Sequence, residues 1–138
     1  MSTTKEIVVK TKEEIINETV EYYNNNSRAR ANYNNTSISC YYLTDDGRMC
    51  AFGRCMLKEK REKLRMKICS IEGMYRNFGI SEKSFHHDLV LKPEYRGHSL
   101  SFWRDIQDLH DYSKFWRHDR KLSEIGKSRV KELKSNYC

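Results

Sequence analysis

The segment 40–55 constrains the fold of this chain more than any other part of its sequence. It reads C-Y-Y-L-T-D-D-G-R-M-C-A-F-G-R-C and holds three of the five cysteines on either side of an Asp46-Gly47 pair. The residues before the pair alternate and are β-prone, and a glycine accepts the positive φ of a tight turn without a steric penalty. We therefore expect a β-hairpin over residues 37–55, in which residues 48–55 form the return strand.

Helical periodicity outside this segment predicts several helices. Thr11 and Glu14 form a capping-box pattern, in which the hydroxyl accepts from a backbone N–H and the carboxylate reaches back to the cap. Apolar residues at helical spacing follow directly. A serine at position 99 or 101 is suited to cap a later helix. The expected helices cover residues 12–25, 100–112 and 122–135.

The last of these helices contains Gly126, which weakens it by about 1 kcal/mol relative to alanine. Two shorter segments are less regular. Residues 56–68 suit a short amphipathic helix, and residues 85–91 suit a short strand that Pro93 ends. The apolar residues expected on the inner face of the last helix are Ile125, Val130 and Leu133.

The length of 138 residues favours a single domain over residues 1–138. We predict an α+β fold, with a small antiparallel sheet around the 37–55 hairpin and three or more packed helices. The N-terminal residues 1–10 are expected to be flexible. The Asn-rich residues 24–36 are expected to form a flexible loop, because asparagine favours turns. A basic loop with Arg28 and Arg30 is a candidate contact for phosphate.

Composition bounds the partners. The formal net charge is +7, and aromatic residues make up 12% of the chain, which argues against disorder. A basic surface attracts nucleic acid, anionic nucleotides or an acidic protein face, although it serves solubility equally well. No apolar run has the roughly 20 residues of a membrane span, and the N-terminus lacks a signal-peptide core. We therefore expect a cytoplasmic protein with reduced thiols and no membrane partner.

The cysteines of the 40–55 segment suggest metal or thiol chemistry. Zinc held by Cys40, Cys50, Cys55 and a histidine is disfavoured, because intervals of nine and four residues do not match the usual zinc-binding spacings. Cys50 and Cys55 also point to opposite faces of a regular strand. Buried reduced cysteines explain the pattern better, since free cysteine is among the most buried residue types. We expect no metal site and no cofactor.

A cysteine nucleophile is the alternative. Cys50 or Cys55 would supply the thiolate, and His110, oriented by Asp111, would be the base of a cysteine-dependent hydrolase. Packing of a small apolar side chain is the more ordinary explanation, so the prediction leans away from an enzyme. Gln107 and His110 share a helical face at i, i+3 spacing. That face is expected to pack over the small residues Ala51 and Gly53.

Anion binding is the preferred chemistry, because arginine forks match phosphate geometry and aromatic rings stack on bases. The sequence contains no P-loop or RNA-recognition motif that would specify the ligand further. The candidate ligand-binding residues are Arg28, Tyr42, Arg48, Arg54, Arg104, Gln107 and His110.

Two segments, residues 40–57 and 102–116, contain a pair of sequence motifs that resembles those of other proteins. A cysteine and an aromatic residue precede D-G-R-M-C-A-F-G-R-C, and I-Q-D-L-H-D follows later. The chain thereby resembles a family of small phage and prophage proteins with D-G-x-x-C-A-x-G-C and L-Q-x-x-H-D. It departs from the family at Arg54, which separates Gly53 from Cys55, and at Ile106, which replaces a leucine. The resemblance implies a phage-type origin and an α+β domain.

Small phage accessory proteins often inhibit host machinery, so the resemblance also shapes the functional prediction. We expect a non-enzymatic accessory protein that binds an anionic partner and inhibits a host system. The partner would be a host defence or nucleic-acid-processing protein, a nucleotide signal, or nucleic acid. Its setting would be the host cytoplasm. The sequence leaves the oligomeric state open.

Overall fold

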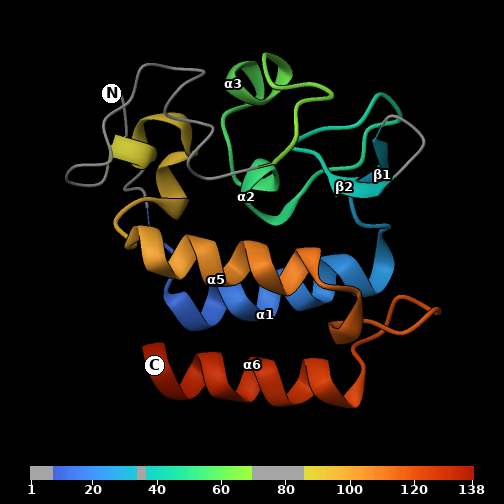
Figure 1. The fold of residues 1–138 in the computed structure, drawn as a ribbon. Coiled ribbons are helices and arrows are strands. Elements are labelled where there is room, and N and C mark those ends of the chain that lie inside the picture. The colour runs from blue at the N-terminus through green and yellow to red at the C-terminus, as the bar shows by residue number, and fades with distance from the viewer. Residues whose placement is uncertain (1–7, 34–36, 70–85) are drawn as a thin grey trace.

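Three long helices dominate the computed structural model, which describes residues 8–33, 37–69 and 86–138. They are α1 (Lys12–Asn25), α5 (Leu100–Asp111) and α6 (Glu124–Tyr137), and each packs against the other two (Figure 1). All three agree with the helices predicted from periodicity. None of the described helices is long and apolar enough to cross a membrane.

Side-chain caps define where these helices begin. The Thr11 hydroxyl accepts from Glu14 N–H and the Glu14 carboxylate accepts from Thr11 N–H, which confirms the predicted capping box of α1. Ser99 accepts from Phe102 N–H at the start of α5, and Ser123 accepts from Gly126 N–H at the start of α6. These caps satisfy backbone donors that have no partner inside the helix.

The sheet differs from the predicted one. It consists of two antiparallel strands, β1 (Arg30–Tyr33) and β2 (Ser37–Cys40), with Arg30 opposite Cys40. The prediction of a loop over residues 24–36 is therefore wrong for β1, while residues 1–7 and 34–36 lie outside the described part of the chain. Helices make up most of the fold, and the sheet is a two-stranded ladder that lies before the predicted turn.

The predicted return strand over residues 48–55 is also wrong. The turn itself forms, since Gly47 has a φ of 90° and Thr44 N–H donates to Arg48 O at 2.9 Å. After one bridge between Leu43 and Met49, the chain becomes helix α2 (Ala51–Arg54). The Cys50 thiol caps this helix by accepting from Gly53 N–H. A local cap therefore replaces the strand ladder.

Short helices cover the remaining described segments. They are α3 (Lys58–Glu62), which fits the predicted helix within residues 56–68, and three 3₁₀ helices. The 3₁₀ helices are η1 (His86–Val90), η2 (Pro93–Tyr95) and η3 (Ser113–Phe115). The predicted strand at residues 85–91 is therefore wrong, because η1 occupies most of that segment.

The core draws residues from α1, α2, α5 and α6, and its aromatic part lies where α2 meets α5. Phe52 of α2 and Trp103 of α5 are fully buried, and their rings meet edge to face with centroids 5.4 Å apart. A Cβ atom on Gly53 would lie 2.4 Å from the carbonyl oxygen of Tyr42, so only glycine permits this close approach. The predicted packing of α5 against this segment is confirmed for α2 as a whole, but Gly53 serves the approach to Tyr42 and not to α5.

Helix α6 uses a glycine for close packing. Leu133 is buried as predicted, whereas Ile125 is 56% exposed and the prediction that it faces inward is wrong. Gly126 occupies the inward position instead, and a Cβ there would lie 2.1 Å from the carbonyl oxygen of Phe115. The glycine therefore lets α6 approach η3, which outweighs its poor helix propensity.

Replacing Gly126 with alanine tests this packing. We expect Gly126→Ala to lower the free energy of unfolding by about 2 kcal/mol or more, because the added methyl overlaps a backbone oxygen. Urea denaturation would measure the change, with Ser128→Ala, an exposed position of the same helix, as the matched control. An alanine at 126 that stabilised the protein, as helix propensity alone predicts, would contradict the packing role.

Candidate functional site

The motif Q-x-x-H-D of α5 forms a buried polar junction. Ala29 N–H donates to His110 Nε2 at 3.1 Å, and His110 Nδ1 lies 2.7 Å from Asp111 Oδ1. Gln107 donates to the same carboxylate oxygen, and its own Oε1 accepts from Phe52 N–H at 3.1 Å. The junction thereby joins α5 to α2 and to the segment that follows α1.

The contacts of His110 determine its protonation. A neutral imidazole carries one proton, and Nε2 must be the acceptor because Ala29 donates to it. The proton therefore lies on Nδ1 and is donated to Asp111. Burial lowers the pKa of His110, which also favours the neutral ring.

Cys40 completes a cluster that resembles a metal site in composition. One ligand atom each from Cys40, His110 and Asp111 lie within 4.8 Å of one another. However, the lone pair of His110 Nδ1 is used by the proton, because Nε2 accepts from Ala29. Burial and the hydrogen bond to Asp111 raise the pKa of the Cys40 thiol, so the thiol keeps its proton. The arrangement favours a hydrogen-bonded junction over a cation site.

A cavity of about 350 Å³ opens beside the Arg28–Arg30 segment that the junction holds. Tyr23 and Trp116 contribute aromatic surface to its wall, and Ser27 and His118 contribute polar groups. Its size falls within the range of pockets for small ligands. Five of the ten lining residues are arginines: Arg28, Arg30, Arg48, Arg117 and Arg120.

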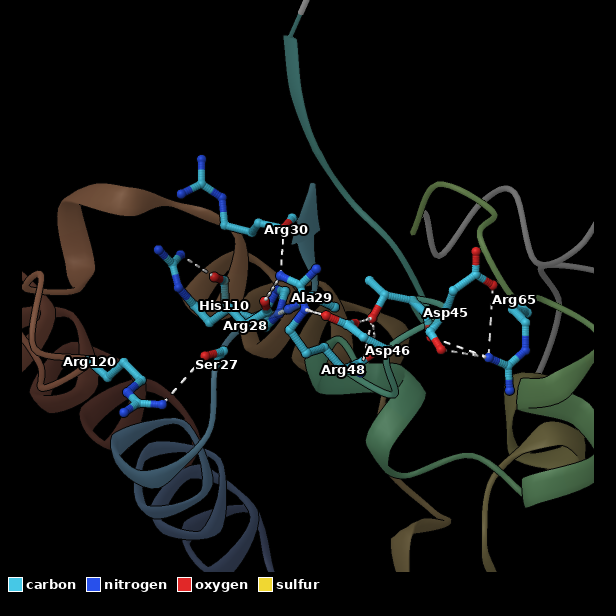
Figure 2. Close-up of polar contacts among 11 residues, drawn as sticks. Ser27, Arg28, Ala29, Arg30, Asp45, Asp46, Arg48, Arg65, His110 and Arg120 are labelled. Atoms are coloured by element: carbon cyan, nitrogen blue, oxygen red, sulfur yellow. Dashed lines mark hydrogen bonds and ion pairs between the residues drawn. The ribbon is translucent and has the colours of Figure 1, made fainter. Parts of the chain in front are cut away.

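Two of these arginines are fixed by backbone carbonyls (Figure 2). Arg28 Nη1 donates to His110 O at 2.7 Å, and its guanidinium lies over the Trp116 ring. Arg48 Nη1 donates to the carbonyls of Arg28 and Arg30 at 3.1 and 2.7 Å, while its Nε lies 3.0 Å from Asp46 Oδ1. The pocket is therefore organised before any ligand binds.

The positive charge of the pocket is only partly compensated. Asp46 pairs with Arg48, and Asp119 lies 3.2 Å from Arg117. Among the described residues, Arg28, Arg30 and Arg120 have no carboxylate within ion-pair distance. Burial and the neighbouring Arg30 lower the pKa of Arg28, because both disfavour the positive charge on its guanidinium.

Arg30 has a buried side-chain donor that the described residues leave without a hydrogen bond. Its Nε is buried and has no hydrogen-bond partner within the described part of the chain. Unpaired buried donors are rare in folded proteins and call for a ligand, a water or an ion. Arg30 also lines the pocket, so its guanidinium lies at the cavity wall without a carboxylate partner among the described residues.

The other predicted ligand residues lie elsewhere. Arg54 is buried, where it pairs with Glu18 and Tyr95. Tyr42 is fully buried, Arg104 is exposed on α5 outside the pocket lining, and Gln107 and His110 belong to the junction. Arg28 and Arg48 line the pocket. Arg117, Arg120 and Trp116 also line the pocket; they belong to the arginines and aromatic residues that suggest anion binding but not to the candidate ligand residues, although the R-H-D-R run at 117–120 is a local signal of positive charge.

The proposed nucleophiles are core residues. Cys50 and Cys55 have no exposed surface. The Cys50 sulfur lies 2.8 Å from that of Cys69, and burial raises the pKa of Cys55 to about 12. The thiol that clusters with His110 is that of Cys40, not Cys50 or Cys55. A reactive thiolate needs access and a lowered pKa, so this geometry gives the hydrolase hypothesis no support.

No protein family, curated protein or solved structure matches this chain. The resemblance to small phage proteins therefore stays a prediction, and functional inference rests on the geometry of the site.

Thiol alkylation separates packing cysteines from a nucleophile. We expect Cys138, which is exposed, to react with iodoacetamide at neutral pH, and Cys50 and Cys55 to react only after unfolding. Peptide mass spectrometry before and after denaturation would locate the modified residues. Rapid modification of Cys50 or Cys55 in the folded protein would revive the hydrolase hypothesis.

Proposed function

We propose that this protein is a non-enzymatic binding protein whose arginine pocket holds an anionic, phosphate-bearing partner. The observation that carries the proposal is that Arg28, Arg30 and Arg120 converge on one cavity without carboxylate partners among the described residues. Guanidinium groups bind phosphate through paired N–H donors, and charge-assisted hydrogen bonds are among the strongest in proteins. An anion would relieve the repulsion among these side chains.

The chemistry of the pocket supports binding rather than catalysis. The described residues that line the pocket include no carboxylate and no cysteine. Among them, His118 is the side chain best suited to act as a general base, and none is a thiol nucleophile. The arginines that are fixed by carbonyl groups are suited to hold charge in place. These features favour a protein that recognises its partner and leaves it unchanged.

The biological role that we propose is that of a phage-type accessory protein. Such a protein would inhibit a host system by occupying a nucleotide signal, a nucleic acid or a host protein that handles them. The net charge of +7 supports an anionic partner of any of these kinds. The size of the pocket favours direct contact with phosphate groups over a broad acidic protein face.

Charge reversal at Arg30 tests the proposal. We expect Arg30→Glu to weaken binding of a fluorescent single-stranded oligonucleotide or of ATP at low salt by about tenfold or more, because it replaces a donor with a repelling charge. Fluorescence anisotropy and calorimetry would measure the two ligands. The fold should be retained, since the Arg30 side chain makes no hydrogen bond or ion pair within the described residues.

The matched control is Lys131→Glu, which makes the same change in net charge at an exposed position of α6 outside the pocket lining. Equal losses in both variants would mean that net charge, and not the pocket, attracts the ligand. If the unaltered protein bound neither ligand at low salt, direct phosphate recognition would be refuted and a protein partner would remain.

A further inference from the structure

Arg120 has a backbone conformation that arginine rarely adopts. Its φ is 71°, in the left-handed region where a Cβ atom crowds the backbone. The chain places glycine at two other such positions, Gly47 with a φ of 90° and Gly97 with a φ of 93°. An arginine at position 120 therefore keeps strain that a glycine would remove. Strained residues cluster at functional sites, where the surrounding structure holds them in place.

The strained residue belongs to a tight turn at the rim of the pocket. Trp116 and Leu122 form an antiparallel bridge, and Arg117 N–H donates to Lys121 O at 2.7 Å across the turn. Arg120 N–H in turn donates to Arg117 O at 3.1 Å. The turn brings Arg117 and Arg120 to the same cavity as the segment that follows α1.

Internal contacts of the Arg120 side chain do not account for the strain. Its one hydrogen bond within the described residues is to Ser27 Oγ, at 3.4 Å between two exposed residues (Figure 2). A bond of that length and exposure contributes little. The guanidinium is therefore available to a ligand while the backbone turn holds it over the pocket.

We propose that the pocket binds a compact polyanion of the triphosphate class, and that Arg120 is held in its strained turn to contact the phosphates. This inference rests on the proposed function and names its ligand class and a binding residue. Arg28 and Arg30, which come from the opposite chain segment, complete a set of three arginines without carboxylate partners among the described residues.

Charge density favours a triphosphate over a nucleic-acid strand. A single strand carries one negative charge per nucleotide along an extended backbone. A cavity of about 350 Å³ would enclose only a short stretch of it, leaving some arginines unmatched. A triphosphate chain places several charges within one cavity. The guanidinium of Arg30 and the fixed guanidinium of Arg28, both at the pocket wall, then meet separate phosphate oxygens.

The chain supplies a matched control at Met66, the other described non-glycine residue with a positive φ, at 58°. Met66 is 41% exposed and is not among the pocket residues. Glycine at either position would relieve the same kind of backbone strain. Only the change at Arg120 would remove a pocket guanidinium.

The test compares Arg120→Gly and Met66→Gly in the full chain. Urea denaturation measures stability, and calorimetry at low ionic strength measures binding of inorganic triphosphate. We expect both variants to have a raised urea midpoint. Arg120→Gly should weaken triphosphate binding by about tenfold or more, the effect of one lost charged hydrogen bond or several, while Met66→Gly should leave it unchanged.

Two results would overturn the role proposed for Arg120. One is an Arg120→Gly variant that binds triphosphate as tightly as the unaltered protein, and the other is a variant with a lowered urea midpoint, which would make Arg120 a structural residue. Binding of a single-stranded oligonucleotide without binding of triphosphate would refute the ligand class and keep the proposed function. Binding of neither would refute both.

Discussion

The hydrogen bond from Ala29 N–H to His110 Nε2 is the interaction on which the rest of the structure depends. It fixes the chain directly after α1 against the end of α5, inside a junction where Asp111 and Gln107 satisfy the remaining polar groups. An unpaired donor or acceptor at such a depth costs about 1–3 kcal/mol. The junction is therefore stable only when each of its members is in place, and it specifies one arrangement of α1, α2 and α5.

The same bond determines where the positive charge lies. Ala29 stands between Arg28 and Arg30, so fixing its backbone places both arginines at the rim of one cavity. Their carbonyl groups in turn receive the guanidinium of Arg48. The Q-x-x-H-D motif of α5 thus positions the arginines of the pocket, although the motif itself is not part of the pocket lining. A buried histidine positions the segment, and the arginines beside it meet the ligand.

Sequence reasoning succeeded where the signal is local. Helical spacing and the Thr11 cap predict α1, and the predicted packing over α2 holds for Gln107, which accepts from Phe52 N–H, whereas His110 accepts from Ala29 N–H. The return strand of the predicted hairpin does not form, for one local reason and one tertiary reason. Cys50 caps a short helix, and Gly53 approaches the carbonyl of Tyr42, so a glycine and a cysteine that looked like strand residues serve helix packing. Tertiary contacts override β-propensity at such positions.

Only some of the arginines of the pocket could be predicted from the sequence, because the pocket joins segments that are far apart along the chain. Arg28 and Arg48 were selected from the sequence, but the 117–120 turn is distant from them along the chain. It meets them through tertiary contacts of Trp116, which lies against Tyr23 of α1 and donates to the carbonyl of Leu109 in α5. The strain at Arg120 is likewise invisible in the sequence, since it depends on a backbone angle. Likewise, Cys40 rather than Cys50 or Cys55 adjoins His110, because the chain between them does not form the expected strand.

The imidazole of His110 offers the most direct test of the claim that this junction organises the pocket. Long-range ¹⁵N NMR on the uniformly labelled protein reports which ring nitrogen carries the proton, and hydrogen exchange reports the protection of the Ala29 amide. We expect a neutral ring protonated at Nδ1 near pH 6.5, because burial lowers the pKa of His110, together with a strongly protected Ala29 amide. A ring protonated at Nε2, or an Ala29 amide that exchanges as freely as an exposed loop, would contradict it.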